Sequence, residues 1–283
     1  MMTTPTPNPI PTSTSTPSSP RITTAVVLAR GLGSRMRAAG QGGLSAEQAA
    51  AAASGHKALM PLGEHRLIDY SLSALADAGI RRAVLVVAPE HEEFARHLAE
   101  LAPSRLEVAF AVQAEPRGTA DAVASAREAV GDAPFIMVNG DNLYPGAGIA
   151  RLLQAEGDAL LGFERAALVE GSNIPADRIA AFALIEQTEG RLDRIVEKPD
   201  AETLAAAGED ALVSMNCFAF TPAIFAACAR IEPSPRGELE IVDAVRELDA
   251  VQVIPFAGGV LDLSRRDDID EVQRRLAGVE VSL

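Results

Sequence analysis

A glycine-containing segment, Gly31-x-Gly33-Ser34-Arg35, follows an apolar stretch that has the composition of a buried strand. A strand that ends in such a loop leaves backbone N–H groups free to bind an anion, and glycine lets a phosphate approach the backbone closely. The dinucleotide-binding fingerprint is excluded because Met36 stands where a third small residue is needed, and no Gly-Lys-Ser/Thr of a P-loop is present. The loop is a candidate phosphate site, although a plain strand-to-helix turn explains it equally well.

Lysine is rare in this chain, because Lys57 and Lys198 are the only lysines among 25 basic residues. A lone lysine is most often a surface residue. Here arginine is used almost everywhere else, and a compact ammonium is not equivalent to a planar guanidinium at a crowded phosphate. Lys57 is followed by Leu59 and Pro61, and Lys198 lies in Glu197-Lys198-Pro199 at the end of a predicted strand. Both lysines are therefore candidate phosphate ligands.

Two aspartates follow apolar segments. Asp141 comes directly after the predicted strand 135–138, and Asp262 ends the segment 258–262. Open α/β sheets bind ligands beyond the carboxyl ends of their strands, and Mg²⁺ is commonly held by one or two carboxylates plus substrate phosphates. The alternative is an Asx turn, which also favours Asp and Asn.

Gln113 stands at the end of another predicted strand. The loop after it contains Pro116 and Gly118, and a helix is predicted to start at Thr119. A glutamine amide donates and accepts at once, which suits reading the edge of a nucleobase. A capped loop without a ligand is the alternative.

These residues would be positioned by alternating strands and helices. The first half has strands predicted at 22–29, 83–88, 106–113 and 135–138, with helices at 67–78, 92–101 and 120–130 between them. The second half has strands at 159–164, 179–187, 192–196, 213–220 and 251–256, few helices between them, and later helices at 237–246 and 267–277. We predict a Rossmann-like three-layer α/β/α fold whose central sheet is mixed and mostly parallel, with a small antiparallel extension in the second half.

The predicted domain boundaries follow from composition. Residues 1–20 are almost entirely Met, Thr, Pro, Ser and Asn, which predicts a disordered tail. Residues 21–283 would form a single domain with two halves, 21–145 and 146–283. A Gly/Ala-rich insertion at 38–55 contains Ser45 and Gln48, which favour a short capped helix in a mobile loop.

Charge and composition exclude several classes of function. The net charge of −14 argues against a general binder of nucleic acid or of anionic membranes. Two cysteines make neither a disulfide framework nor a zinc site. No apolar run reaches the length of a bilayer span and no signal-peptide core is visible, so a soluble cytoplasmic protein is expected.

Taken together and in order, these segments resemble the sugar-1-phosphate nucleotidylyltransferase family over about residues 22–265. Its best-known members are glucose-1-phosphate thymidylyltransferases and UTP–glucose-1-phosphate uridylyltransferases. The family loop Gly-x-Gly-Thr-Arg-Leu/Met and the following Lys-x-Leu/Met-x-Pro match at Gly31, Gly33, Ser34, Arg35, Met36, Lys57, Leu59 and Pro61. The segment 236–241 with Asp243 resembles the thymidylyltransferase branch.

The resemblance implies that 21–145 is the nucleotide-binding half and 146–283 the sugar-phosphate-binding half, and it implies roles for individual residues in each. Arg35, Lys57 and Lys198 would be catalytic, and Asp141 and Asp262 would bind Mg²⁺. The nucleotide would be bound by Ala29, Gly31, Gly33, Ser34, Gln113, Gly118 and Thr119. The sugar phosphate would be bound by Gly140, Asn142, Glu197 and Asn216.

The implied reaction transfers a nucleoside monophosphate from an NTP to a sugar 1-phosphate, or to a sugar-like cyclitol phosphate, and releases pyrophosphate. Its partners are these two substrates, and a homo-oligomer is compatible with the sequence. Three departures concern the pockets: Arg30 replaces a small residue, the loop before Lys57 is long, and 214–218 reads Ser-Met-Asn-Cys-Phe. The nucleobase and the sugar stay open. A nucleotide-sugar-dependent glycosyltransferase, which would be expected to carry an Asp-x-Asp motif, and a non-catalytic nucleotide-sugar sensor are the alternatives.

Overall fold

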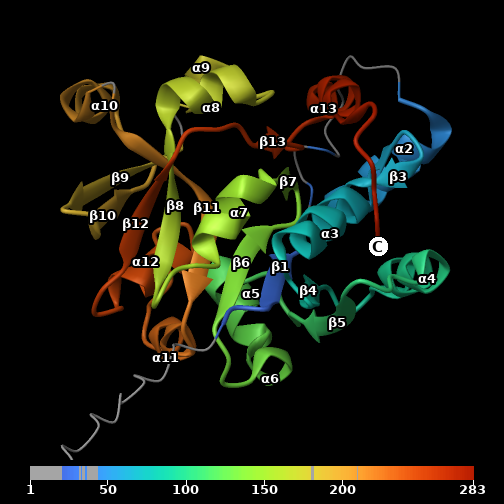
Figure 1. Cartoon of the computed structure of the whole chain (residues 1–283), viewed down its shortest axis with the longest axis horizontal. Helices are drawn as coiled ribbons and strands as arrows, with labels where there is room; N and C mark the ends of the chain where they lie inside the picture. Colours follow the sequence, from blue (N-terminus) through green and yellow to red (C-terminus); the bar gives the residue numbers. More distant parts are fainter. Residues whose placement is uncertain (1–20, 32, 34–35, 37–43, 180–181, 209) are drawn as a thin grey trace, which may run out of the picture.

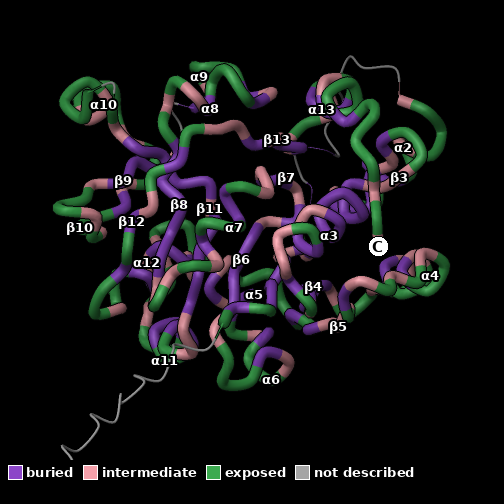
Figure 2. The backbone as a smooth tube through the Cα atoms, in the orientation of Figure 1, coloured by how far each residue is buried: buried purple, intermediate pink, exposed green. Residues whose placement is uncertain are grey.

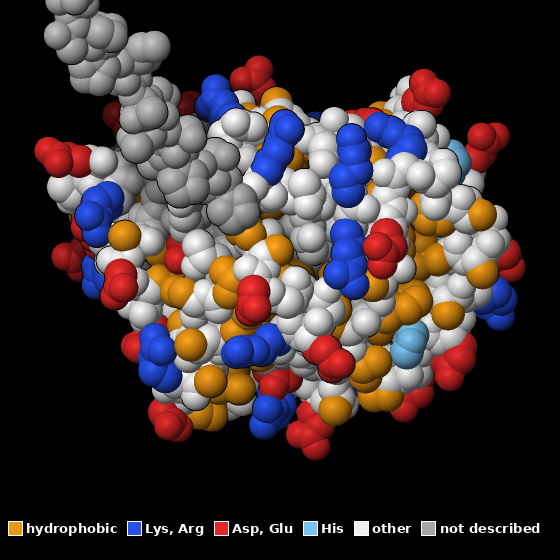
Figure 3. Space-filling model, turned by 60° about the horizontal axis from the view of Figure 1, so that its bottom comes forward, with side chains coloured by type: hydrophobic (Ala, Val, Ile, Leu, Met, Phe, Trp, Pro, Cys, Tyr) orange, Lys and Arg blue, Asp and Glu red, His pale blue; other side chains and the backbone are white. Residues whose placement is uncertain are grey.

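The computed structural model describes residues 21–31, 33, 36, 44–179, 182–208 and 210–283. The predicted disordered tail, residues 1–20, lies outside the described residues. None of the described helices is both long and apolar enough to cross a bilayer. On the face drawn in Figure 3, acidic and basic side chains lie interspersed.

Nine strands form one sheet that runs through both halves of the chain (Figure 1). In spatial order they are β5 (Glu107–Val112), β4 (Arg82–Val87), β1 (Thr24–Leu28), β6 (Phe135–Asn139), β11 (Leu212–Phe220), β8 (Ala159–Glu164), β12 (Gln252–Phe256), β10 (Arg191–Val196) and β9 (Ala183–Thr188). The first four are parallel to one another, as the order of strands and helices predicts. Their carboxyl ends therefore share one edge of the sheet.

The sheet is mixed, as predicted, but it is not mostly parallel. Among the pairings of described strands, four are parallel and five are antiparallel. β11 causes most of this difference, because it lies antiparallel between β6 and β8 and also pairs with β9. β11 is buried along nearly its whole length. A strand covered on both faces has the same continuous apolar sequence in either direction, so the sequence did not indicate its orientation.

Helices cover both faces of the sheet and give the predicted three layers. α3 (Leu67–Ala78), α4 (Glu92–Leu101), α7 (Gly146–Leu152) and α8 (Arg165–Gly171) pack on one face. α5 (Thr119–Ser125), α6 (Arg127–Val130), α11 (Ala223–Cys228) and α12 (Ile241–Arg246) pack on the other. Successive residues of β1 alternate between the two cores, since Ala25 and Val27 belong to the first and Val26 to the second. Figure 2 shows the resulting buried centre and the exposed outer sides of the helices.

The insertion before Lys57 contains the predicted helix, α2 (Ala46–Ser54). The side chain of Ser45 accepts from the backbone N–H of Gln48 at 3.1 Å, and Gln48 Oε1 accepts from the backbone N–H of Ser45 at 3.1 Å. This confirms the capping box. α2 is not loose, because Ala51 and Ala52 are buried in a third apolar cluster with the hairpin β2 (Pro61–Leu62) and β3 (His65–Arg66) and with α13 (Ile269–Leu276).

Two predictions for the second half are wrong. It carries more helices than expected, including α9 (Ala176–Ile179) and α10 (Ala201–Ala207), but those from α7 to α11 have only four to seven residues each. Such short helices show little periodicity. The helix predicted at 237–246 begins only at Ile241, because Leu239 pairs with a distant loop: its N–H donates to Arg117 and its carbonyl accepts from Ala120.

Candidate active site

A cavity of about 280 Å³ opens at the carboxyl edge of the parallel strands. Eight predicted site residues from four separate segments line it: Ala29, Gly31, Lys57, Gln113, Gly118, Thr119, Gly140 and Asp141. The strand order explains this, because β5, β4, β1 and β6 all end at this edge. The structure thus brings together most of the predicted nucleotide-binding residues.

The phosphate loop and the lysine segment lie against each other. Gly33 has a φ of +58°, and a Cβ there would lie 2.6 Å from the carbonyl oxygen of Gly55. Only glycine fits such a contact with backbone. Gly55 in turn ends α2, and its carbonyl accepts from the N–H of Lys57 at 2.9 Å. Ser34 and Arg35 lie outside the described residues, so their roles stay predictions.

Lys57 and Asp141 form an ion pair inside the cavity. Lys57 starts a short 3₁₀ helix, and its Nζ donates to Asp141 Oδ2 at 2.7 Å. The lysine side chain is 15% exposed and the aspartate side chain 30% exposed. The Asp141 carboxylate thus holds the Lys57 ammonium in the cavity where the sequence predicts that phosphates bind. A positive charge is available there although the chain as a whole is negatively charged.

The loop after β5 is built to hold Gln113 in a fixed orientation. Gln113 is buried, and its Nε2 donates to the carbonyl of Gly118 at 3.1 Å and to Asp121 Oδ2 at 2.8 Å. Gly118 has a φ of +123°, and a Cβ there would lie 2.4 Å from the carbonyl oxygen of Leu239. The hydroxyl of Thr119 accepts from the N–H of Ile241 at 2.8 Å. The segment 236–241 is therefore one wall of the site, and Glu238 lines the cavity.

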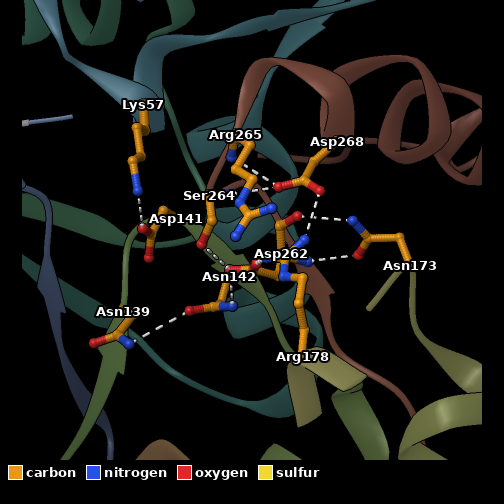
Figure 4. A network of polar contacts seen from close by, with 10 residues as sticks. All are labelled: Lys57, Asn139, Asp141, Asn142, Asn173, Arg178, Asp262, Ser264, Arg265 and Asp268. Atoms are coloured by element: carbon orange, nitrogen blue, oxygen red, sulfur yellow. Dashed lines mark hydrogen bonds and ion pairs between the residues drawn. The ribbon is translucent and has the colours of Figure 1, made fainter. Parts of the chain in front are cut away.

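Asp262 lies in a second polar network, beyond Asp141 (Figure 4). The short strands β7 (Asn142–Leu143) and β13 (Leu261–Asp262) pair and place Asn142 opposite Asp262. Asp262 Oδ1 accepts from Asn142 at 3.2 Å and from Ser264 at 2.9 Å, and its Oδ2 accepts from Arg178 at 2.5 Å. Burial raises the pKa of the Asp262 carboxyl, and the nearby charge of Asp141 raises it further.

The two predicted metal ligands differ in how well they fit a divalent cation. Asp141 has one oxygen bonded to Lys57, and its other oxygen has no hydrogen-bond partner among the described residues. This donor suits Mg²⁺, which is often held by one carboxylate plus phosphates and water. Asp262 has donors on both oxygens, and Arg178 also pairs with Asp268 at 2.8 Å. Both oxygens of Asp262 already accept hydrogen bonds, so this carboxylate is less open to a cation than that of Asp141, and its metal role stays a prediction.

The predicted sugar-phosphate residues lie outside the cavity, with the exception of Gly140. Glu197 and Lys198 are exposed at the end of β10, and Lys198 has a φ of +47°. Asn216 has a φ of +55° in an irregular stretch of β11, next to Met215, whose carbonyl accepts from the buried hydroxyl of Tyr144 at 2.6 Å.

One electrostatic effect places Glu197 near the wall segment 236–241. Burial raises the pKa of the Glu240 carboxyl, Arg236 opposes that rise, and the charges of Glu238 and Glu197 add to it. Glu197 is therefore close enough to Glu240 for their charges to interact, although it does not line the cavity.

Three polar lining residues were not predicted as site residues: Arg30, Asn139 and Glu238. Arg30 was visible only as a departure from the family loop, and Glu238 lies in the segment that resembles the thymidylyltransferase branch. Asn139 ends β6 directly before Gly140, and its Nδ2 donates to Asn142 at 3.4 Å.

The sequence identifies the family, and a solved structure shows the same fold. The chain matches the family described as nucleotidyl transferase over residues 24–254, and it belongs to this family. UDP-glucose pyrophosphorylase, solved as a complex with UDP-glucose, superposes with a TM-score of 0.71 over 92% of this chain and 100% of its own, at 16% identity. That likeness shows a shared fold.

The similar curated proteins are nucleotidyltransferases. Agl11 of Haloferax volcanii, a low-salt glycan biosynthesis nucleotidyltransferase, is 31% identical over 226 residues, which cover 79% of this chain and 56% of Agl11. Glucose-1-phosphate thymidylyltransferase of Streptomyces antibioticus is 33% identical over 254 residues, 88% of this chain and 65% of that protein. UTP–glucose-1-phosphate uridylyltransferase AglF of Haloferax volcanii is 27% identical over 263 residues, which cover 89% of this chain and 96% of AglF. The chain thus spans 56% to 65% of the length of the first two relatives.

Proposed function

We propose that this chain transfers a nucleoside monophosphate from an NTP to a sugar 1-phosphate, or to a sugar-like cyclitol phosphate, and releases pyrophosphate. The observation that carries the proposal is the single cavity in which the glycine loop, the Lys57–Asp141 pair and the Gln113–Gly118 loop meet. These three parts match a triphosphate, its counter-charges and a nucleobase. The substrates named for the similar curated proteins are of the same class.

In this reaction an oxygen of the sugar phosphate attacks the α-phosphorus in line, and the bond from that phosphorus to the bridging oxygen of pyrophosphate breaks. No general base is needed, because a phosphate monoester with a second pKa of about 6 is mostly dianionic at neutral pH. Catalysis then consists of positioning and charge neutralisation.

Lys57 and Asp141 would exchange partners when the nucleotide binds. Their ion pair is replaced when phosphate oxygens accept from the Lys57 ammonium. The freed Asp141 carboxylate would hold Mg²⁺, which neutralises phosphate charge when it is bound. The backbone of Gly31 and Gly33 would bind the triphosphate, with Arg35 on the leaving pyrophosphate.

The sugar-phosphate side would use the exposed residues beyond the cavity. Lys198 would hold the incoming phosphate, and Glu197 would accept from a sugar hydroxyl. Gly140, Asn142 and Asn216 would complete this side. Because Lys198 lies outside the nucleotide cavity, the second substrate would bind beside the nucleotide and not within the same cavity.

The test is pyrophosphate release in a coupled assay with five NTPs against several sugar and cyclitol phosphates, with Mg²⁺ or with a chelator. We expect release only with both substrates and the metal. Asp141→Asn should lower kcat/KM by at least about 10²-fold, whereas Asp132→Asn, at an exposed position outside the cavity, should change little. Release by Asp141→Asn at the wild-type rate would refute the metal role. Nucleotide-sugar consumption without pyrophosphate would indicate a glycosyltransferase instead.

A further inference from the structure

Lys57 lies in a segment, residues 56–66, whose two ends bind the same carboxylate. His56 directly precedes Lys57, and its Nδ1 lies 3.3 Å from Glu93 Oε2. Arg66 ends β3, and its Nη1 donates to Glu93 Oε1 at 3.3 Å. An ionised carboxylate can only accept, so the proton in the first contact is on His56 Nδ1. Glu93 therefore binds the segment that carries Lys57 with one oxygen at each end.

Glu93 itself is held by α4. It lies in the first turn of this helix, where the positive end of the helix dipole stabilises a carboxylate. The next residue, Phe94, is buried in the core, and its ring centroid lies 5.6 Å from that of His56. The side chains of His56 and Glu93 are 25% and 33% exposed, so their contact is partly shielded from water. The end of a packed helix, and not a loop, thus fixes the residue before Lys57.

Packing alone does not fix this segment on the side of the glycine loop. A cavity of about 190 Å³ separates the loop from the start of α4, and its lining includes Gly31, His56, His91 and Phe94. Side chains beside a void lack contacts there and are freer to shift. The bond from His56 to Glu93 therefore supplies a restraint that packing does not provide.

This restraint matters most once a nucleotide is bound. In the structure, Asp141 also holds the Lys57 ammonium (Figure 4), but in the proposed reaction phosphate oxygens replace this carboxylate. Resting on the proposed function, we propose that Glu93 is a positioning residue for Lys57: by binding His56 and Arg66 it keeps the ammonium at the reacting phosphates after Asp141 has been displaced. Glu93 does not line the nucleotide cavity, so it acts only through the segment 56–66.

The kinetic test is Glu93→Ala, which frees both ends of the segment. A shift of about 1 Å in a group that positions substrate can cost up to about 10²-fold in rate, so we expect kcat for pyrophosphate release to fall by about 10- to 100-fold. KM for the sugar phosphate should not change, because Lys198 is on a separate element. Glu92→Ala, at an exposed position in the same helical turn, is the matched control and should keep wild-type kcat. An unchanged kcat in Glu93→Ala, or an equal fall in Glu92→Ala, overturns the proposal.

Glu93→Gln distinguishes the bridging contacts from the charge of Glu93. The amide oxygen can accept from Arg66, and the amide nitrogen can donate to His56 Nδ1 in its other tautomer. Both contacts are then kept without the negative charge, so kcat should stay within about threefold of the wild-type value. A loss as large as that of Glu93→Ala would mean that the charge, and not the bridge, is required, and would overturn the proposal.

Amine labelling tests the positioning without the reaction, because Lys57 and Lys198 are the only lysines in the chain. Lys57 is 15% exposed and paired with Asp141, whereas Lys198 is exposed and serves as the internal reference. Acetic anhydride is applied well below the melting temperature of each variant, and the labelled peptides are quantified by mass spectrometry. In Glu93→Ala the ratio of the Lys57 rate to the Lys198 rate should rise at least about fivefold.

The same ratio should keep its wild-type value in Glu92→Ala and Glu93→Gln. If the wild type releases no pyrophosphate with any substrate pair, the proposed function fails, and the labelling ratio still tests whether Glu93 holds Lys57. An unchanged ratio in Glu93→Ala overturns the proposal even if the reaction is confirmed.

Discussion

The two sides of the candidate site are built differently. On the nucleotide side, Lys57, Gln113 and Asp141 are held by bonds to other parts of the chain, at the ends of parallel strands. On the sugar-phosphate side, Lys198 and Asn216 lie outside the cavity, in backbone with positive φ. Under the proposed function, the nucleotide side is assembled before substrate arrives, whereas the sugar-phosphate side would gain its contacts from the substrate. Substitutions should therefore affect stability and activity together on the first side, and activity alone on the second.

The strongest test of the nucleotide side is Lys57→Met. It removes the ammonium and leaves the partly buried Asp141 carboxylate without its partner, so both activity and melting temperature should fall. We expect kcat/KM for pyrophosphate release to drop by about 10³-fold. Arg96→Met, at an exposed residue of α4, is the control and should preserve both quantities. A Lys57→Met enzyme with full activity would contradict the proposed role of the Lys57–Asp141 pair on the nucleotide side.

On the other side, Lys198→Met should act on activity alone. Loss of this exposed ammonium should raise KM for the sugar phosphate by about 10²-fold, with KM for the NTP and the melting temperature unchanged. Arg191→Met, at the exposed start of the same strand, is the matched control. If NTP binding or stability changed as much as sugar-phosphate binding, the two sides would not be separate.

Gly118→Ala tests how tightly the base loop is held against segment 236–241. The new Cβ would collide with the Leu239 carbonyl in addition to the strain of a φ of +123°, so we expect a loss of about 2–4 kcal/mol in the free energy of unfolding. Gly131→Ala is the control, because it has a φ of +70° but open space around its Cβ, and it should cost only about 1 kcal/mol. Urea unfolding measures both. Equal costs would mean that backbone strain, and not the contact with Leu239, requires glycine at 118.

The last prediction concerns two buried thiols in the core and leaves activity untouched. Burial raises the pKa of the Cys228 thiol to about 12 and also raises that of Cys217. At pH 8 the native thiols should react with iodoacetamide roughly 10³-fold more slowly than an ordinary cysteine. The rate at Cys228 should rise about tenfold per pH unit from 7 to 10, because the thiolate fraction does. Mass spectrometry of the labelled peptides, with urea-unfolded protein as reference, measures this, and fast labelling of native Cys217 would show that β11 is open.

Local motifs in the sequence predicted well which residues would meet at the cavity. The glycine loop, Lys57, Gln113 and Asp141 each follow a predicted strand or loop, and parallel strands bring such ends to one edge. The capping box of Ser45 and the helix Leu67–Ala78 were also predicted correctly, because both depend only on residues that are close in the sequence. The orientation of β11 and the start of α12 depend on distant partners, so the sequence predicted them poorly.

By itself, the sequence determined the family, the glycine loop and the types of residue available for charge neutralisation. The tertiary structure alone decided which partner each charged group has. Arg178 donates to the carboxylates of Asp262 and Asp268, which are 84 and 90 residues away in the sequence. Arg30 donates to the carbonyl of Ala114, also 84 residues away. The physical reason is that hydrogen bonds and ion pairs depend on distances of a few ångströms, which strand order and packing set between segments far apart in the chain.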